Sequence, residues 1–68
     1  MVVAIYKNNS KSAPEQIKVH KYESDGKFRV ESITNSYAHE VGGIYETLED
    51  VEKYLESRDR VFGYTKII

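Results

Sequence analysis

The sequence contains no cysteine and no tryptophan, and it has one proline, one methionine and four glycines among its 68 residues. Without cysteine, neither a disulfide framework nor a thiolate zinc site can stabilise the fold. The longest apolar run, residues 1–6, is far too short to span a bilayer and has no basic leader. We therefore expect a cytoplasmic protein with no membrane association, stabilised by packing or by a partner.

Neither sign of charge is in large excess. The chain has ten Lys/Arg and eleven Asp/Glu, which gives a formal net charge of −1. Residues 1–34 hold six basic and four acidic side chains (+2), whereas residues 35–68 hold four and seven (−3). Dedicated nucleic-acid binders usually carry a clear basic excess, so this asymmetry does not name a partner. With 40% hydrophobic and 31% charged residues, the composition predicts a single folded domain over residues 1–68.

Motifs that carry catalysis or bind cofactors are also missing. The glycines, at positions 26, 42, 43 and 63, fit neither a phosphate-binding loop nor a dinucleotide fingerprint. The segment HEVGG begins like the zinc helix of a metalloprotease, but Gly43 stands where the second histidine is needed. His20 and His39 are the only imidazoles, and two surface histidines are the better interpretation. We therefore expect no enzyme, no cofactor, no metal and no small-molecule substrate.

The first half of the chain predicts β-structure. Residues 1–7 (MVVAIYK) are rich in β-branched side chains and predict a strand, and residues 8–16, with the only proline, predict a loop. Residues 16–34 predict a β-hairpin, because Asp25-Gly26 supplies the positive φ values of a two-residue type I′ turn. That turn would place Tyr22 opposite Arg29, and His20 opposite Glu31. It would also put Ile17, Val19, Phe28 and Val30 together on the other face.

The second half predicts a capped helix between β-segments. Residues 35–41 and 44–46, on either side of Gly42-Gly43, predict a third hairpin arm or a bulged strand. Thr47 is a natural N-cap, Glu49 and Lys53 are spaced for an ion pair, and Arg58 and Arg60 suit the C-terminal end. The apolar stripe of this helix consists of Leu48, Val51, Tyr54 and Leu55.

Residues 60–68 (RVFGYTKII) predict a closing strand, whose apolar side chains suit a central or well-covered position. The expected fold is then α+β. It consists of a small β-sheet, antiparallel or mixed, of four to five strands, with one α-helix at about residues 48–58 packed on one face. The order of the elements is β-β-β-(β)-α-β.

One surface of the 16–34 hairpin is the candidate binding site. It consists of Lys18, His20, Tyr22, Lys27 and Arg29, with Glu31 as the one acid beside them. Basic side chains interleaved with an aromatic one can hold a phosphate backbone and stack on a base. A solvated sheet face with alternating charges has the same composition, and this second interpretation is the favoured one.

The run GGIYETLEDVEKYL (residues 42–55), after a three-stranded sheet, resembles the strand-to-helix junction of plant AP2-type domains and of the arm-binding N-terminal domains of phage integrases. The resemblance implies a sheet laid against DNA with the helix packed behind it. This chain has only part of the basic and aromatic density of those sheets, and its C-terminal strand departs from them.

Two functions from different classes follow. The favoured one is a small protein-interaction module, an accessory or regulatory protein of bacterial or phage type, which docks to a protein partner or forms a homodimer. Its support is the absence of catalytic motifs, the near-zero net charge and six tyrosines, whose side chains suit contact surfaces. The alternative is a nucleic-acid-binding domain that uses the outer face of the hairpin. A third and minor possibility is an acidic helix surface that imitates a nucleic-acid backbone, formed by Glu46, Glu49, Asp50, Glu52, Glu56 and Asp59.

Overall fold

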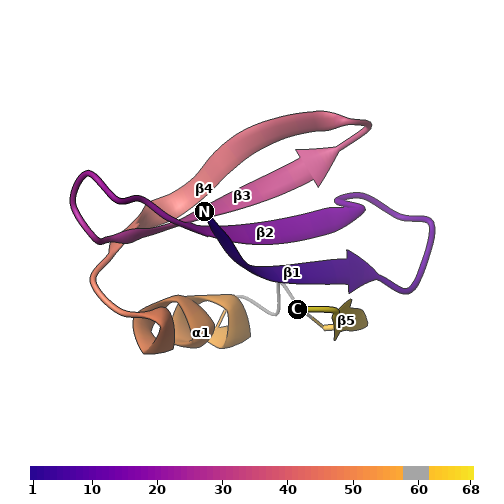
Figure 1. Ribbon diagram of the computed structural model, residues 1–68. Coiled ribbons are helices and arrows are strands. Elements are labelled where there is room, and N and C mark those ends of the chain that lie inside the picture. Colours follow the sequence, from indigo (N-terminus) through magenta and orange to yellow (C-terminus); the bar gives the residue numbers. More distant parts are fainter. Residues whose placement is uncertain (58–61) are drawn as a thin grey trace.

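The computed structural model describes residues 1–57 and 62–68, which form one antiparallel sheet and one helix. The strands follow the order β4-β3-β2-β1-β5 across the sheet, and α1 lies on one side of it (Figure 1). The elements are β1 (Val2–Asn8), β2 (Gln16–Lys21), β3 (Phe28–Thr34), β4 (Tyr37–Tyr45), α1 (Leu48–Ser57) and β5 (Tyr64–Lys66). The α+β class, the element order and the helix on one face are confirmed, and every strand pair is antiparallel.

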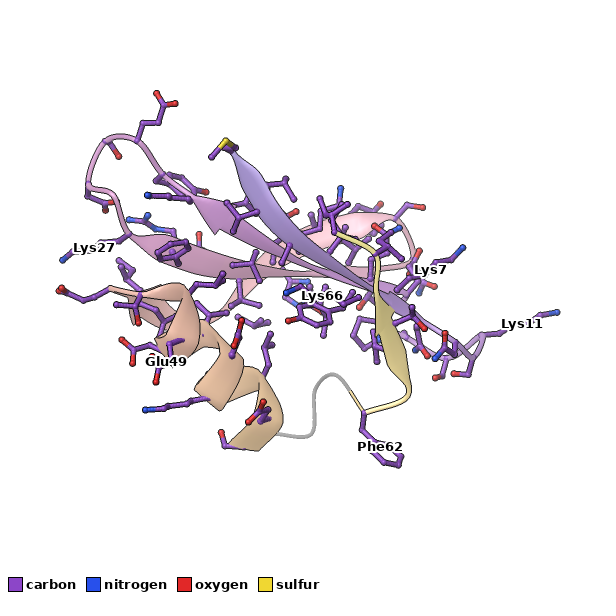
Figure 2. All side chains as sticks on the ribbon, turned by 60° about the horizontal axis from the view of Figure 1, so that its bottom comes forward. Lys7, Lys11, Lys27, Glu49, Phe62 and Lys66 are labelled. Carbon is purple, nitrogen blue, oxygen red and sulfur yellow. The ribbon has the colours of Figure 1, made fainter. Side chains whose placement is uncertain are left out.

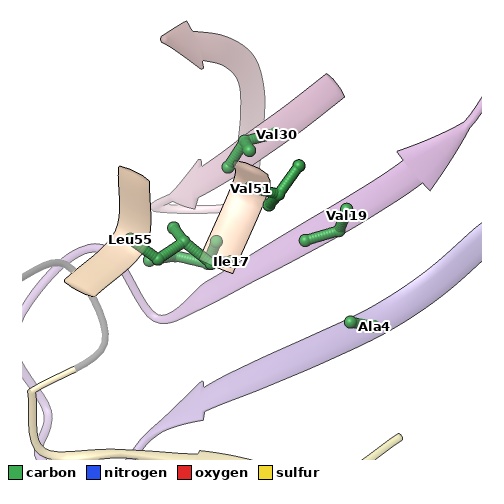
Figure 3. Packing of buried hydrophobic residues seen from close by; sticks show 6 residues of the cluster. All are labelled: Ala4, Ile17, Val19, Val30, Val51 and Leu55. Atoms are coloured by element: carbon green, nitrogen blue, oxygen red, sulfur yellow. The ribbon is translucent and has the colours of Figure 1, made fainter. Parts of the chain in front are cut away.

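The hydrophobic core lies between α1 and the inner face of the sheet (Figure 3). Strand alternation brings Ile17, Val19 and Val30 to this face, and the helical spacing brings Val51 and Leu55 against them. Each of these side chains is almost fully buried, which stabilises the fold by about 1.5–3 kcal/mol per side chain. The opposite face of the sheet, called the outer face below, is not covered by α1.

The helix forms where its local sequence predicts. Thr47 Oγ1 accepts a hydrogen bond from the amide of Asp50 at 3.1 Å, so the predicted N-cap is confirmed. Glu49 and Lys53 form the expected ion pair, with 3.7 Å between Oε1 and Nζ. The helix is described as far as Ser57. The predicted end at residue 58, and the predicted roles of Arg58, Asp59 and Arg60, lie outside the described residues. In the part of the chain that is described, no helix is long and apolar enough to cross a membrane.

The 16–34 hairpin is present, but its predicted register is wrong by two residues. His20 lies opposite Arg29, and Lys18 lies opposite Glu31. The turn is longer than predicted, because the amide of Tyr22 bonds the carbonyl of Lys27 and leaves four residues between them. Two residues are one full strand period, so every side chain keeps its predicted face despite the shift.

β3 and β4 form a second tight hairpin. Asn35 (φ 51°) and Ser36 (φ 69°) occupy the two central positions between Thr34 and Tyr37, as a type I′ turn requires. The Glu15 carboxylate accepts hydrogen bonds from the amides of Asn35 (2.6 Å) and Ser36 (3.2 Å), which fixes the turn against the start of β2.

The segment around Gly42-Gly43 belongs to a bulged strand, which was one of the two predicted alternatives. The register of β4 against β3 shifts between Val41 and Ile44, so the two glycines are extra residues in the ladder. Gly42 has φ 72°, and a Cβ at this position would lie 2.7 Å from Tyr45 Oη and 2.9 Å from Tyr54 Cζ. Glycine is therefore favoured at position 42 for two reasons, its φ angle and its close neighbours.

The predicted central position of the C-terminal strand is wrong. β5 is a three-residue edge strand that, among the described residues, pairs with β1 alone, and it begins at Tyr64 after a turn at Phe62 and Gly63. Phe62 is 86% exposed and points away from the fold (Figure 2). The apolar residues that suggested a covered strand are therefore mostly at the surface, since Ile67 and Ile68 are exposed as well.

Candidate functional site

The hairpin face, defined as Lys18, His20, Tyr22, Lys27 and Arg29, is assembled by β2, β3 and the turn between them. Its centre is Arg29, whose guanidinium lies 4.2 Å from the ring centroid of Tyr22 and donates from Nη2 to Asp25 Oδ2 at 2.8 Å. Asp25 also accepts from the amide of Lys27 at 2.9 Å. The hydrogen bond from Arg29 is the main reason why the pKa of Asp25 lies below its ordinary value and that of Arg29 above.

The other basic groups of the hairpin face have acidic neighbours too. His20 Nε2 lies 3.2 Å from Glu31 Oε1, and Lys27 Nζ lies 3.5 Å from Glu46 Oε1. Lys18 faces Glu31 across the ladder, without an ion pair to it within the described residues. The structure therefore places these five side chains on one surface and sets an acidic group beside three of the four basic ones. The Arg29 side chain is only 16% exposed, so its guanidinium is largely committed to intramolecular contacts.

A second surface, which the sequence did not reveal, is the free side of an edge strand. The sheet has two edges, and they differ in their protection (Figure 1). β5 is three residues long and carries Lys66, whose Nζ lies 6.0 Å from the Tyr6 ring centroid. β4 is nine residues long and contains no lysine, arginine or proline. Short length, charge, proline and bulges are the usual devices that prevent pairing at an edge. β5 is short and charged, whereas in β4 the bulge at Gly42-Gly43 leaves the straight residues 37–41 open to pairing.

The pairing of β4 with β3 determines which of its main-chain groups are open. Thr34 and Tyr37 flank a two-residue turn and form the first hydrogen-bonded pair, after which non-bonded and bonded pairs alternate along the two strands. Ala38 and Glu40 belong to non-bonded pairs. Their amides and carbonyls therefore point away from β3. The straight part of the strand ends at the bulge after Val41. We call the outward side of residues 37–41 the β4 edge.

The side chains along the β4 edge are accessible. Tyr37, Ala38, His39 and Glu40 are all exposed, and Tyr37 is 79% exposed. Pairing with β3 places Ala38 and Glu40 on the outer face, and Tyr37, His39 and Val41 on the inner face. The sequence signal for this site is the absence of lysine, arginine and proline from YAHEV, but that absence has meaning only once the strand is known to lie at an edge.

An open cleft of about 550 Å³ lies at the C-terminal end of β1, between the 9–15 loop and the start of β5. Its polar groups are bonded to each other: Asn8 Nδ2 donates to the carbonyls of Ser12 (2.8 Å) and Pro14 (3.1 Å), and the Tyr64 hydroxyl also donates to the Pro14 carbonyl. These contacts connect the loop to β5. Among the described residues, no cluster of three or more histidine or acidic side chains could hold a metal ion.

Comparison of the chain with models of known protein families, with curated proteins and with solved structures finds no match. The resemblance of residues 42–55 to AP2-type and integrase domains therefore stays an expectation from the sequence.

Proposed function

We propose that this chain is a small, non-enzymatic protein-interaction module that binds an extended segment of a protein partner as an additional strand beside β4. The observation that carries the proposal is the β4 edge: residues 37–41, the straight part of β4, which lack lysine, arginine and proline and, among the described residues, pair with β3 alone. An accessory or regulatory role in the cytoplasm of a bacterium or of a phage-infected cell is consistent with such docking, and it remains a prediction from the sequence.

Strand addition suits a domain of this size. The main-chain groups of an edge strand supply affinity, while side chains on alternate positions supply specificity, so no deep pocket is needed. Ala38 and Glu40 offer two sets of main-chain donors and acceptors to an incoming strand. The Asn35-Ser36 turn, fixed by the Glu15 carboxylate, holds one end of this edge in place. The β4 edge is therefore ordered before a partner arrives.

The charge balance of the hairpin face favours docking over nucleic-acid binding. Binding to a phosphate backbone draws on cations that can exchange their counterions for phosphates. Arg29 is bonded to Asp25, Lys27 lies near Glu46, and His20 lies near Glu31, so three of the four basic groups have an acidic neighbour already. A nucleic acid would have to compete with these contacts.

The experiment is a selection of nine-residue peptides from a displayed library on the immobilised chain, followed by NMR titration of the labelled chain with the selected peptides. We expect the largest shifts at the amides of Ala38 and Glu40. Ala38→Pro removes an outward amide and should abolish binding, whereas Lys66→Pro makes the matched change at the β5 edge and should not. Ala38→Lys, which adds a charge to the same edge, should weaken binding if the proline variant does not fold.

Two results would overturn the proposal. The first is selected peptides that bind Ala38→Pro, shown to be folded by its amide spectrum, as tightly as the unmodified chain. The second is a salt-sensitive titration with a mixed DNA duplex or single strand that shifts Lys18 and Arg29 and disappears in a Lys18→Glu, Arg29→Glu double variant. That outcome would establish the nucleic-acid alternative.

A further inference from the structure

The surroundings of Glu40 indicate what kind of strand the β4 edge accepts. Glu40 lies on the outer face directly opposite Glu31 of β3. Like charges at directly opposite positions repel each other. Glu31 has His20 beside it at 3.2 Å, whereas Glu40 has no ion pair within the part of the chain that the structure describes. Arg29 is near enough to interact electrostatically with Glu40, but its guanidinium is bonded to Asp25.

A strand added beside β4 would place a cation next to Glu40 without disturbing this arrangement. A residue directly opposite Glu40 on an added strand would have its Cβ about 4.5–5.5 Å from that of Glu40. A lysine or arginine there would give Glu40 an ion pair of its own, since the guanidinium of its neighbour Arg29 is bonded to Asp25. A carboxylate there would be a third acid in the same row of the outer face, after Glu31 and Glu40.

The inner face favours different side chains. Residues on either side of the position opposite Glu40 point to the inner face, because strand side chains alternate. There they would lie opposite His39 and Val41, and Val41 is already packed on the edge of the core. The residue opposite His39 would also have Tyr37, which is 79% exposed, as a diagonal neighbour, so an apolar side chain there would be within reach of the Tyr37 ring.

We infer that the β4 edge selects a strand that carries a lysine or arginine opposite Glu40 and apolar residues at the neighbouring positions. This inference rests on the proposed docking function and specifies its partner. A second copy of this chain does not meet the requirement at the same edge, because β4 contains no basic residue other than His39, which lies on the inner face. Symmetric pairing of two β4 edges is therefore disfavoured, and the occupant that we infer is a strand-forming segment of a different protein with a basic residue at this position.

The test uses three fluorescein-labelled peptides of nine residues that alternate threonine and valine. The central residue, on the threonine face, is lysine, glutamine or glutamate. Fluorescence anisotropy measures their binding to the full chain at low salt. We expect the lysine peptide to bind about tenfold more tightly than the glutamate peptide, with the glutamine peptide between them. The difference should decrease as salt increases.

Two variants show whether Glu40 is responsible. Glu40→Lys should reverse the order, so that the glutamate peptide binds most tightly. Glu23→Lys makes the same change in net charge at the tip of the β2–β3 turn and should leave the preference for lysine unchanged. NMR shifts at Ala38 and Glu40 on binding of the lysine peptide show that the peptide occupies the β4 edge.

The outcomes distinguish the charge selection at Glu40 from the docking function of the β4 edge. Equal binding of all three peptides at the β4 edge overturns the charge selection and leaves the docking function standing. Failure of every peptide to shift Ala38 or Glu40 at millimolar concentration contradicts both. Self-association that Ala38→Pro abolishes would identify a second copy as the occupant and would overturn the inference of a basic partner; sedimentation velocity at two protein concentrations decides this.

Discussion

Replacing Gly42 by alanine tests the geometry of the bulge that ends the β4 edge. The substitution has two unfavourable effects: it places an alanine at φ 72°, and it puts a Cβ within 2.7 Å of Tyr45 Oη and 2.9 Å of Tyr54 Cζ. Left-handed backbone costs a residue with a Cβ about 1–2 kcal/mol. Overpacking in a close contact adds about 1–3 kcal/mol. Loss of glycine flexibility from the unfolded chain offsets about 0.4–1 kcal/mol of the total.

Two other glycines separate these contributions. Gly26 has φ 69°, and a Cβ at this position would have no neighbour within 4 Å, so Gly26→Ala reports the backbone effect alone. Gly43 has open space and no positive φ, so Gly43→Ala should change stability by less than about 0.5 kcal/mol. We expect losses of about 1 kcal/mol for Gly26→Ala and about 2–4 kcal/mol for Gly42→Ala.

Urea unfolding followed by far-ultraviolet circular dichroism measures all three variants with a common m-value. A domain of this size has a free energy of unfolding of about 3–5 kcal/mol, so Gly42→Ala alone could unfold much of the population. Such unfolding, with Gly26→Ala and Gly43→Ala still folded, would agree with the expectation. The reasoning fails if Gly42→Ala is no less stable than Gly26→Ala, because the contacts with Tyr45 and Tyr54 would then have no effect.

Three further predictions concern capping and pH. Thr47→Ala should lower the free energy of unfolding by about 1 kcal/mol, while Thr47→Ser should retain most of it, as urea unfolding would show. The hydrogen bond from Arg29 lowers the pKa of Asp25 below its ordinary value of 3.8. The ionised Asp25 carboxylate therefore stabilises the fold above pH 3.8, and this stabilisation is lost as the pH falls through the lower folded-state pKa. The stability difference between the unmodified chain and Asp25→Asn should therefore shrink with acidification, and a constant difference would contradict the assignment. Burial, with a smaller effect of two helix carboxylates, raises the pKa of Tyr6 above 10.0. The neutral Tyr6 side chain therefore stabilises the fold below pH 10, and this stabilisation is lost as the pH rises through the folded-state pKa. Tyr6→Phe should consequently lose less stability than the unmodified chain in the alkaline range, measured by denaturant unfolding at each pH.

The helix was predictable because its determinants are local. Thr47, the acids that follow it and the stripe of Val51 and Leu55 all lie within about three turns, and each favours the same helix. Tertiary contacts had only to supply the surface on which the stripe packs. The same holds for the faces of the 16–34 hairpin, since the side-chain alternation of its strands is a property of the strand itself.

The register of that hairpin was not predictable from the same pattern. A shift of two residues leaves every side chain on its face, so the hydrophobic pattern cannot distinguish the two registers. The turn chemistry was ambiguous as well. Gly26 has the positive φ expected of it, but Asp25 uses its carboxylate to bind the amide of Lys27 and the guanidinium of Arg29, which stabilises a longer turn.

Strand order explains the remaining differences. The apolar residues of 60–68 suggested a central strand, yet β5 pairs with β1 at an edge, and no residue within the segment determines that choice. The β4 edge escaped prediction for the same reason. YAHEV has the same composition in the middle of a sheet as at its margin, and only the partners contributed by distant segments make it an edge. The hairpin face could be located from the sequence, but the contact of Lys27 with Glu46 could not, because it depends on where β4 ends.

Amide hydrogen exchange along β4 tests the central claim most directly. In the unbound chain at low concentration, the amides of Ala38 and Glu40 should exchange rapidly, while those of His39 and Val41, which point toward β3, should be protected. Addition of the lysine-containing strand peptide should slow exchange at Ala38 and Glu40 and leave the amides of the β5 edge unchanged. Protection of Ala38 and Glu40 before any partner is added, or no change in their exchange when the peptide is bound, would contradict the account.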